Sequence, residues 1–167
     1  MHYSEIYRDE TNLLRIHFYE PNTNEIAIHS HRTNIGSVVL NGCLINERYK
    51  IQISEEGTHQ EYASFHSGES CGFRPNSTTK YNPILERTEK LGKEDYLHIK
   101  QGELHLVRVP ESTITLCLFY TDGDFGESKL YFTPSEYERE TDRMDNPVIL
   151  NQRLMQNKID QLRQLFQ

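Results

Sequence analysis

Two histidines two positions apart, His29 and His31, are the residues of this chain whose types and spacing point most directly to chemistry. In a β-strand, side chains two positions apart point to the same face, roughly 7 Å from each other along the chain. Two imidazoles on one face can each bring a nitrogen to about 2.0–2.1 Å from a shared ion. On a helix the same spacing would send the two rings to different faces. A strand at residues 28–32 would therefore place two ligands for a metal site on one face. The alternative for such a pair is two ordinary polar strand residues.

A third histidine follows a turn signal in the second half of the chain. Gly102 stands three residues before His105, and His105 opens the apolar alternating run from Leu106 to Val109. Alternation of this kind is typical of a half-buried strand. We therefore expect His105 to project from the start of a strand and to supply a third imidazole to the same site.

The first pair lies in a stretch that resembles the first motif of the cupin superfamily. That motif reads Gly, five residues, His-x-His, three or four residues, Glu, six residues and Gly. His29 and His31 stand at the two histidine positions and Gly42 at the closing glycine, whereas Thr23 replaces the leading glycine and Ile35 replaces the glutamate.

The third histidine lies in a stretch that resembles the second cupin motif, Pro-x-Gly-x-x-His-x-x-x-Asn. Gly102 and His105 match it, whereas Lys100 and Val109 replace the proline and the asparagine. The resemblance covers roughly residues 13–132. It implies an all-β fold, the cupin double-stranded β-helix or jelly-roll barrel, with one divalent metal ion bound by three histidines.

The resemblance also bears on the metal and the reaction. Most metal cupins are similar to a pattern of three histidines and one glutamate, and Ile35 cannot be a ligand. A site of three neutral histidines leaves the ion its full charge and favours a bound anion, thiolate or deprotonated water. This set is similar to that of the thiol dioxygenases, where three histidines hold ferrous iron. Zinc, manganese or nickel are alternatives, because the ligand type alone does not select the metal.

A later strand departs from the thiol dioxygenase pattern. Cysteine dioxygenases carry Ser-x-His-x-Tyr after the third histidine, and this chain has Thr115, Cys117 and Phe119 at those places. The hydroxyl is kept, but the histidine and the tyrosine are not. The resemblance therefore implies the fold and the metal rather than cysteine as the substrate.

Three further residues are candidates for catalytic roles. Arg15 and His17 would share one face of a strand at residues 13–19. The planar guanidinium of Arg15 can bind a carboxylate or phosphate, and His17 can serve as an acid or base. Glu103, on the turn beside His105, can serve as a general base. The alternatives are an outward, solvated face for the first two and a solvated loop carboxylate for Glu103.

Three functions are compatible with these residues. The first is a mononuclear non-haem iron oxygenase or dioxygenase acting on a small polar or anionic substrate. The second is a non-redox metal enzyme, an isomerase or lyase. The third is a non-enzymatic module that binds a small molecule. One fold can host all three, so the fold does not choose among them.

The overall composition limits the kinds of partner that this protein is expected to bind. The chain has 167 residues and a formal net charge of −7, which argues against a nucleic-acid surface and gives no reason to expect binding to an anionic membrane. No apolar run is long enough for a transmembrane helix, and the start of the chain lacks a signal-peptide pattern. The three cysteines, an odd number without close pairing, favour reduced thiols and a cytoplasmic location.

Turn residues and alternation predict how the chain is organised. We expect a cupin β-barrel domain over residues 1–133, beginning with a loose lead-in at 1–12. It includes a long loop at 67–82, with room for one short strand, that is a candidate lid or rim. A C-terminal helical extension occupies 134–167, with its helix starting at Asn146-Pro147 and packing on the barrel or at a homodimer contact. Strands are expected at residues 13–19, 25–32, 35–40, 43–53, 60–67, 83–90, 96–99, 105–109, 113–120 and 129–132.

Overall fold

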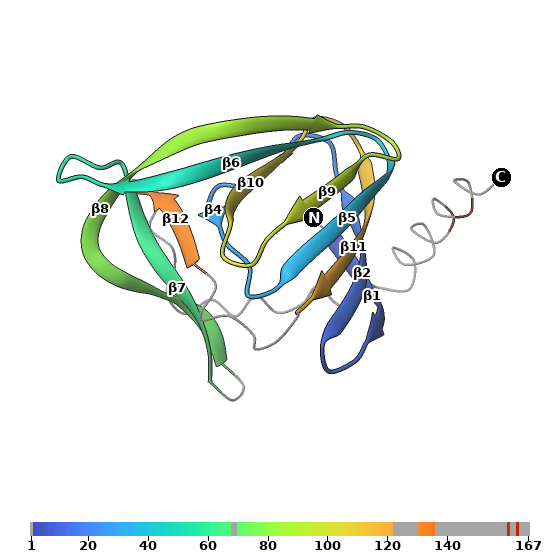
Figure 1. Ribbon diagram of the computed structural model, residues 1–167, viewed down its shortest axis with the longest axis horizontal. Coiled ribbons are helices and arrows are strands. Elements are labelled where there is room, and N and C mark those ends of the chain that lie inside the picture. Colours follow the sequence, from blue (N-terminus) through green and yellow to red (C-terminus); the bar gives the residue numbers. More distant parts are fainter. Residues whose placement is uncertain (1, 68–69, 122–129, 136–159, 161–162, 164–167) are drawn as a thin grey trace.

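The structure, a computed structural model, describes residues 2–67, 70–121, 130–135, 160 and 163. Its described strands are antiparallel and lie in two sheets (Figure 1). The strands in this part are β1 (His2–Arg8), β2 (Asn12–Tyr19), β3 (Thr23–Asn24), β4 (Ile28–His29), β5 (Asn34–Asn41), β6 (Leu44–Ile53), β7 (His59–Ser67), β8 (Ser70–Leu91), β9 (Tyr96–Ile99), β10 (Leu104–Val109), β11 (Thr113–Tyr120) and β12 (Leu130–Pro134).

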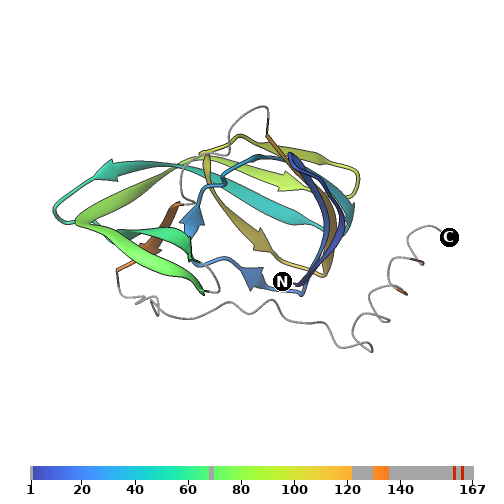
Figure 2. The same cartoon turned by 90° about the horizontal axis from the view of Figure 1, so that it is seen from below.

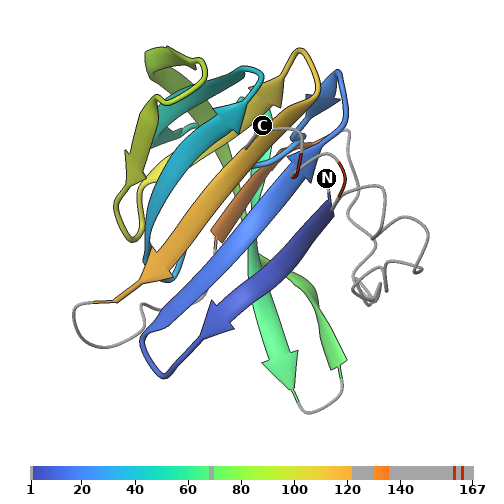
Figure 3. The same ribbon diagram turned by 90° about the vertical axis from the view of Figure 1, so that its right-hand side faces the viewer.

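The two sheets have the strand order of a jelly roll. The first follows β1-β2-β11-β5-β9, and Figure 3 shows these strands side by side. The second follows β3-β10-β4-β12-β7-β8-β6, and β10 also pairs with β6, so this sheet curls back on itself. The inner strands β2-β11-β5-β9 and β4-β10-β6-β8 are the two halves of a jelly roll. Figure 2 shows them as curved layers around a shared interior.

The main core lies between the two sheets and follows from alternation along the strands. On β5, Ile35 and Val39 point inward, and on β10, Val107 and Val109 do the same. Each buried side chain of this size stabilises the fold by about 1.5–3 kcal/mol. The same cluster contains Tyr19, Leu44, Leu91, Leu97 and Ile99. The predicted all-β barrel is therefore confirmed.

The predicted long loop at residues 67–82 is wrong, because the chain there forms the first half of β8. This strand pairs with β7 along its first part and with β6 along its second part. Its turn-like composition is accommodated by an irregularity in register, where the partners of Gln60 and Tyr62 jump from Lys80 to Pro75. Pairing on two successive partners thus overrides a local sequence that favours turns. The candidate lid is a strand of the second sheet.

Two further strand predictions differ from the structure. The predicted loose lead-in contains β1, which pairs with β2 from His2 to Arg8 and adds an edge strand to the first sheet. The predicted strand at 25–32 is regular only at Ile28 and His29. Beyond it, Ser30 leaves the regular ladder, although its N–H still donates to the carbonyl of Leu130 at 3.0 Å.

Two glycines close the turns that were predicted around the histidine motifs. Gly42 lies in the β5–β6 turn with φ of 82°, and Gly102 lies in the β9–β10 turn with φ of 77°. Both angles fall in the left-handed region, which glycine adopts without steric cost. A β-carbon at Gly42 would also lie 2.4 Å from the carbonyl oxygen of Ser112. Both turns are therefore present, but the hairpin that Asn41-Gly42 favours does not form, because β5 lies in the first sheet and β6 in the second and the two strands do not pair.

The predicted C-terminal helix falls on residues that lie outside the described part of the chain, apart from Asp160 and Arg163. It stays a prediction, as does the domain boundary after residue 133. Among the residues that the structure describes, no helix is both long and apolar enough to cross a lipid bilayer.

Candidate metal centre

The three predicted metal ligands lie together in the barrel. His29 on β4 and His105 on β10 are directly opposite each other in the ladder. Their ring centroids are 4.6 Å apart, and the ring of His31 lies 4.8 Å from that of His29 and 5.0 Å from that of His105. One ligand nitrogen from each lies within 4.8 Å of the others. The predicted convergence is confirmed.

His31 reaches the cluster from the chain just past β4 rather than from a regular strand. Its carbonyl oxygen accepts a hydrogen bond from the backbone N–H of Gly102 at 3.0 Å. Gly102 belongs to the turn that leads into His105. The backbone thus joins the two histidine motifs directly, and this bond holds His31 beside the start of β10.

Hydrogen bonds to the outer nitrogens orient two of the rings. His105 Nδ1 lies 2.8 Å from Asn46 Oδ1, and His29 Nδ1 lies 3.2 Å from the carbonyl oxygen of Ala27. Both oxygens are acceptors, so each Nδ1 carries the proton and donates it. The proton on Nδ1 leaves Nε2 with a free lone pair in a neutral imidazole. Both rings therefore have a nitrogen ready to be a metal ligand.

The donor set fits a divalent metal ion. His31 Nε2 and His105 Nε2 are 2.9 Å apart. Two nitrogens at that separation, each about 2.1 Å from one ion, would subtend roughly 90° at it. Three neutral imidazoles suit iron, zinc, copper and nickel. Ile35, at the position of the cupin glutamate, is a buried core residue and adds no oxygen.

A carboxylate that the sequence reasoning did not single out lies behind His29. Glu25 Oε2 is 3.7 Å from His29 Nδ1 and accepts a hydrogen bond from the backbone N–H of Val107 at 2.7 Å. Carboxylates in this position relative to a ligand histidine raise its basicity. The spacing of four residues before His29 was the available signal, but it has a structural meaning only once β10 is known to lie alongside.

Arg15 and His17 point into the barrel, so the alternative of an outward, solvated face is wrong. His17 is 7% exposed. The Arg15 guanidinium lies 4.3 Å from the ring centre of Tyr3 and 5.5 Å from that of Phe119. Phe119 is itself 6.0 Å from the His17 ring and 6.2 Å from the His31 ring. This aromatic ring therefore neighbours both the metal-centre candidate and the Arg15–His17 pair, whose catalytic role stays a prediction.

His17 is a neutral, partly unsatisfied group. Burial, together with the charge of Arg15, lowers its pKa from 6.5 to about 4. Its Nδ1 lies 3.3 Å from the hydroxyl of Tyr19 and 3.9 Å from the thiol of Cys117, whose pKa is raised by burial. His17 Nε2 and Arg15 Nε are buried without a hydrogen-bond partner among the described residues. Two adjacent inward positions of β2 thus present polar atoms that a ligand could satisfy.

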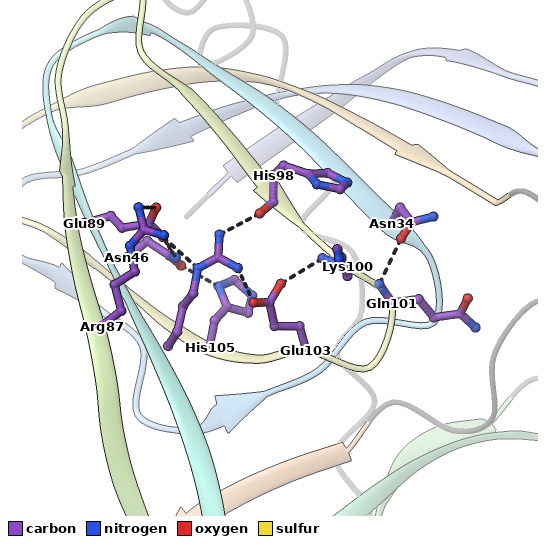
Figure 4. A network of polar contacts seen from close by, with 10 residues as sticks. Asn34, Asn46, Arg87, Glu89, His98, Lys100, Gln101, Glu103 and His105 are labelled. Atoms are coloured by element: carbon purple, nitrogen blue, oxygen red, sulfur yellow. Dashed lines mark hydrogen bonds and ion pairs between the residues drawn. The ribbon is translucent and has the colours of Figure 1, made fainter.

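Glu103 is held in an ion pair rather than solvated on its turn. Its carboxylate accepts from the Arg48 guanidinium and from the backbone N–H of Lys100, the latter at 2.9 Å (Figure 4). Arg48 also donates to the carbonyl oxygen of His98 at 2.7 Å. The role of Glu103 as a general base stays a prediction, and the structure gives its carboxylate two partners on the β9–β10 turn and β6.

The sequence reasoning missed Asn46, which contacts His105 directly. Asn46 is fully buried, two positions after the inward-facing Leu44 of the same strand. A polar residue at an inward position of a strand is itself a signal, because such residues are buried only with a hydrogen-bond partner. That partner, His105, is 59 residues away and could not be identified from the strand alone.

No family model matches this chain, and no curated protein does either. Three solved structures that resemble it have low identity and TM-scores below 0.5. A cupin superfamily protein from Desulfitobacterium hafniense has 8% identity and a TM-score of 0.44, over 72% of this chain and 76% of that one. An RmlC-like cupin from Shewanella frigidimarina has 10% identity and a TM-score of 0.41, over 73% and 77%. Hydroquinone 1,2-dioxygenase PnpCD has 11% identity and a TM-score of 0.42, over 72% and 63%.

The topology itself identifies the fold. The strand order of the two sheets is that of a jelly roll, the architecture that cupins use. The histidines at the cupin motif positions, His29, His31 and His105, converge inside it. The predicted cupin-type fold with a three-histidine cluster is therefore confirmed.

Proposed function

We propose that this protein is a metal-dependent enzyme, a mononuclear non-haem iron oxygenase or dioxygenase, that acts on a small polar or anionic substrate. The observation that carries the proposal is the cluster of His29, His31 and His105, with ligand nitrogens within 4.8 Å of one another. Two of these rings donate through Nδ1 to protein oxygens and so present Nε2 to a shared ion.

The composition of the cluster supports ferrous iron as the metal. The cluster contains three imidazoles, which bind a metal ion in their neutral form, and the cupin glutamate is replaced by Ile35. Iron oxygenases hold ferrous iron by three protein ligands and leave positions open, and the iron supplies dioxygen activation next to a bound substrate. With only neutral ligands, the positive charge also favours an anionic substrate.

Arg15 and His17, on β2 of the first sheet, also support an anionic substrate. Arg15 is a permanent cation that faces inward beside Phe119, and its nearest acidic neighbour, Glu5, is 4.0 Å away and partly exposed. Among the residues that the structure describes, His17 Nε2 and Arg15 Nε have no hydrogen-bond partner. In this arrangement Arg15 would orient a carboxylate or similar anion through its planar fork, while neutral His17 would hold or accept a hydrogen bond.

Oxygen uptake tests the proposal. Protein reconstituted with ferrous iron without air, then mixed with oxygen and a panel of small carboxylates and thiols, should consume oxygen with at least one of them. His105→Ala should abolish that uptake, because it removes a ligand. His59→Ala is the matched control, since His59 lies outside the cluster, and it should keep the uptake.

Two results would contradict the oxygenase. Full activity in metal-stripped protein would exclude any metal-dependent reaction. Turnover with zinc or manganese and no need for oxygen would instead identify an isomerase or lyase at the same three histidines, with the ion acting as a Lewis acid.

A further inference from the structure

Asn46 is a fully buried amide at the centre of the second sheet, and metal binding alone does not explain why it is polar. A buried amide costs stability unless its donors and acceptor are hydrogen-bonded. Asn46 meets this requirement with two side-chain partners. Its Oδ1 accepts from His105 Nδ1 at 2.8 Å, and its Nδ2 donates to Glu89 Oε2 at 3.1 Å.

The second partner fixes which way the amide points. An ionised Glu89 carboxylate can only accept hydrogen bonds, so the Asn46 group that faces it must be the NH2 group. Arg48 Nε donates to the same Glu89 oxygen at 2.7 Å, and Arg87 lies 2.9 Å from the other oxygen. These cations keep the pKa of Glu89 low, against the effect of its partial burial, so it stays ionised. The carbonyl oxygen of Asn46 is thereby directed at His105.

The network continues to the turn that precedes His105. Arg48 also donates to Glu103 and to the backbone carbonyl of His98 (Figure 4). Each of the three guanidinium nitrogens of Arg48 donates a hydrogen bond, and an ionised carboxylate only accepts. The direction of each hydrogen bond is therefore fixed. Arg48 and the Asn46 NH2 group both donate to Glu89, and His105 Nδ1 donates to the Asn46 oxygen.

We infer that Asn46, held by Glu89 and Arg48, is the positioning residue that sets the tautomer and ring orientation of His105 so that its Nε2 faces the metal. This inference rests on the proposed metal binding. With Nδ1–H donated to a neutral amide, His105 can bind an ion without releasing a proton. Outer-shell partners of this kind typically contribute 10–100-fold in metal affinity.

Titration with Co²⁺ alone, followed by visible absorbance, tests the inference in three variants. Asn46→Leu keeps a branched side chain but removes the acceptor, and it should weaken Co²⁺ binding about 10–100-fold. Thr113→Val is the matched control. Thr113 is equally buried and bonds the backbone of Cys43 at 2.8 and 3.0 Å, so its loss should lower stability but leave Co²⁺ affinity unchanged. His105→Ala gives the reference for a lost ligand.

The tautomer can be read in the wild-type protein, which covers the case in which Asn46→Leu does not fold. Nitrogen-15 NMR of the metal-free protein at alkaline pH should show His105 with its proton on Nδ1. A proton on Nε2 would overturn the inference. So would a folded Asn46→Leu variant that binds Co²⁺ within twofold of wild type while His105→Ala does not bind. If the wild-type protein itself does not bind Co²⁺, zinc or ferrous iron, the proposed function fails and the inference fails with it.

Discussion

At the scale of single residues, the histidines of this barrel differ according to what touches their outer nitrogens. His105 and His29 donate through Nδ1 to protein oxygens and so have Nε2 available. His17 lies among aromatic rings and a buried thiol, and its Nε2 has no partner among the described residues. His105 and His29 are therefore suited to bind a metal ion. His17 is suited to contact a substrate or to remain a neutral buried group.

His17 should make stability depend on pH in a specific window. Its pKa is lowered from 6.5 to about 4 by burial and by Arg15. Below pH 6.5 the unfolded chain binds the proton first, so folding stability falls as the pH drops from about 6.5 to about 4, and the full difference is about 3 kcal/mol.

Urea unfolding at several pH values, compared with His17→Gln, measures this effect. Because other groups titrate in both proteins, only the difference between the two curves reports on His17. Wild type should lose stability relative to His17→Gln as the pH falls from 6.5 to 4, and the difference should be constant above pH 7.5. Parallel curves across that window would contradict the account of His17 as a buried neutral group.

Arg48 should matter more for stability than a cation elsewhere on the same strand. It lies between Glu89 and Glu103. The side chain of Arg48 is 19% exposed, that of Glu89 15% and that of Glu103 28%. Arg48→Met leaves two partly buried carboxylates without their shared partner, and we expect a loss of about 3 kcal/mol.

Lys50→Met is the matched control for Arg48→Met. Lys50 also lies on β6 and pairs with Glu86, but it is 73% exposed. Such exposed pairs contribute less than about 1 kcal/mol. Chemical denaturation of both variants separates the cases, and equal losses would show that the Arg48 contacts in the network are no stronger than a surface ion pair.

At the scale of elements, turns and pairing decide where the histidine motifs meet. The sequence predicted the strands around both motifs because apolar alternation and glycine turns agree there. It missed the strand character of residues 70–82 because their composition is that of a turn, and only the pairing of β8 with β7 and β6 explains it. It extended the His29 strand too far, because β4 ends where Ser30 leaves the regular ladder.

The two turn glycines should differ in their tolerance of alanine. At Gly42 a β-carbon would meet the Ser112 oxygen at 2.4 Å and the Thr113 hydroxyl at 2.6 Å, in addition to adopting a left-handed conformation. At Gly102 the conformation is also left-handed, but nothing lies within 4 Å of the added carbon. Gly102→Ala should cost about 1–2 kcal/mol, and Gly42→Ala clearly more.

Thermal unfolding of the two alanine variants checks this difference. Gly42→Ala should have the lower melting temperature of the two, because the β5–β6 turn must shift its backbone as well as adopt an unfavourable φ. A larger loss for Gly102→Ala would mean that the β9–β10 turn, rather than the β5–β6 turn, is the more constrained connection between the sheets.

At the scale of the whole molecule, two facing sheets bring distant motifs to one interior. The sequence supports the barrel class and the three-histidine cluster, because the motif spacings refer to turns and strands that are local. It does not support the Asn46–Glu89–Arg48 network, because Glu89 pairs with residues 41 and 43 positions away. Contacts between strands depend on register, and register is not visible in a single sequence.

The same argument explains Arg15 and His17. Their shared face was predicted by alternation, but which face looks inward depends on the pairing of β2 with β11. Once β11 is placed, Cys117 and Thr115 lie opposite them and the pair faces the interior. Sequence alternation thus predicts which side chains go together, and the fold decides where they point.

The metal content of protein purified without added metal tests the central claim most directly. Elemental mass spectrometry should find close to one iron per chain in wild type and in His59→Ala, and almost none in His29→Ala/His31→Ala. Zinc, manganese or nickel at the same occupancy would keep the site but contradict the iron oxygenase. Wild-type protein with no metal and no uptake of ferrous iron without air would contradict the metal centre itself.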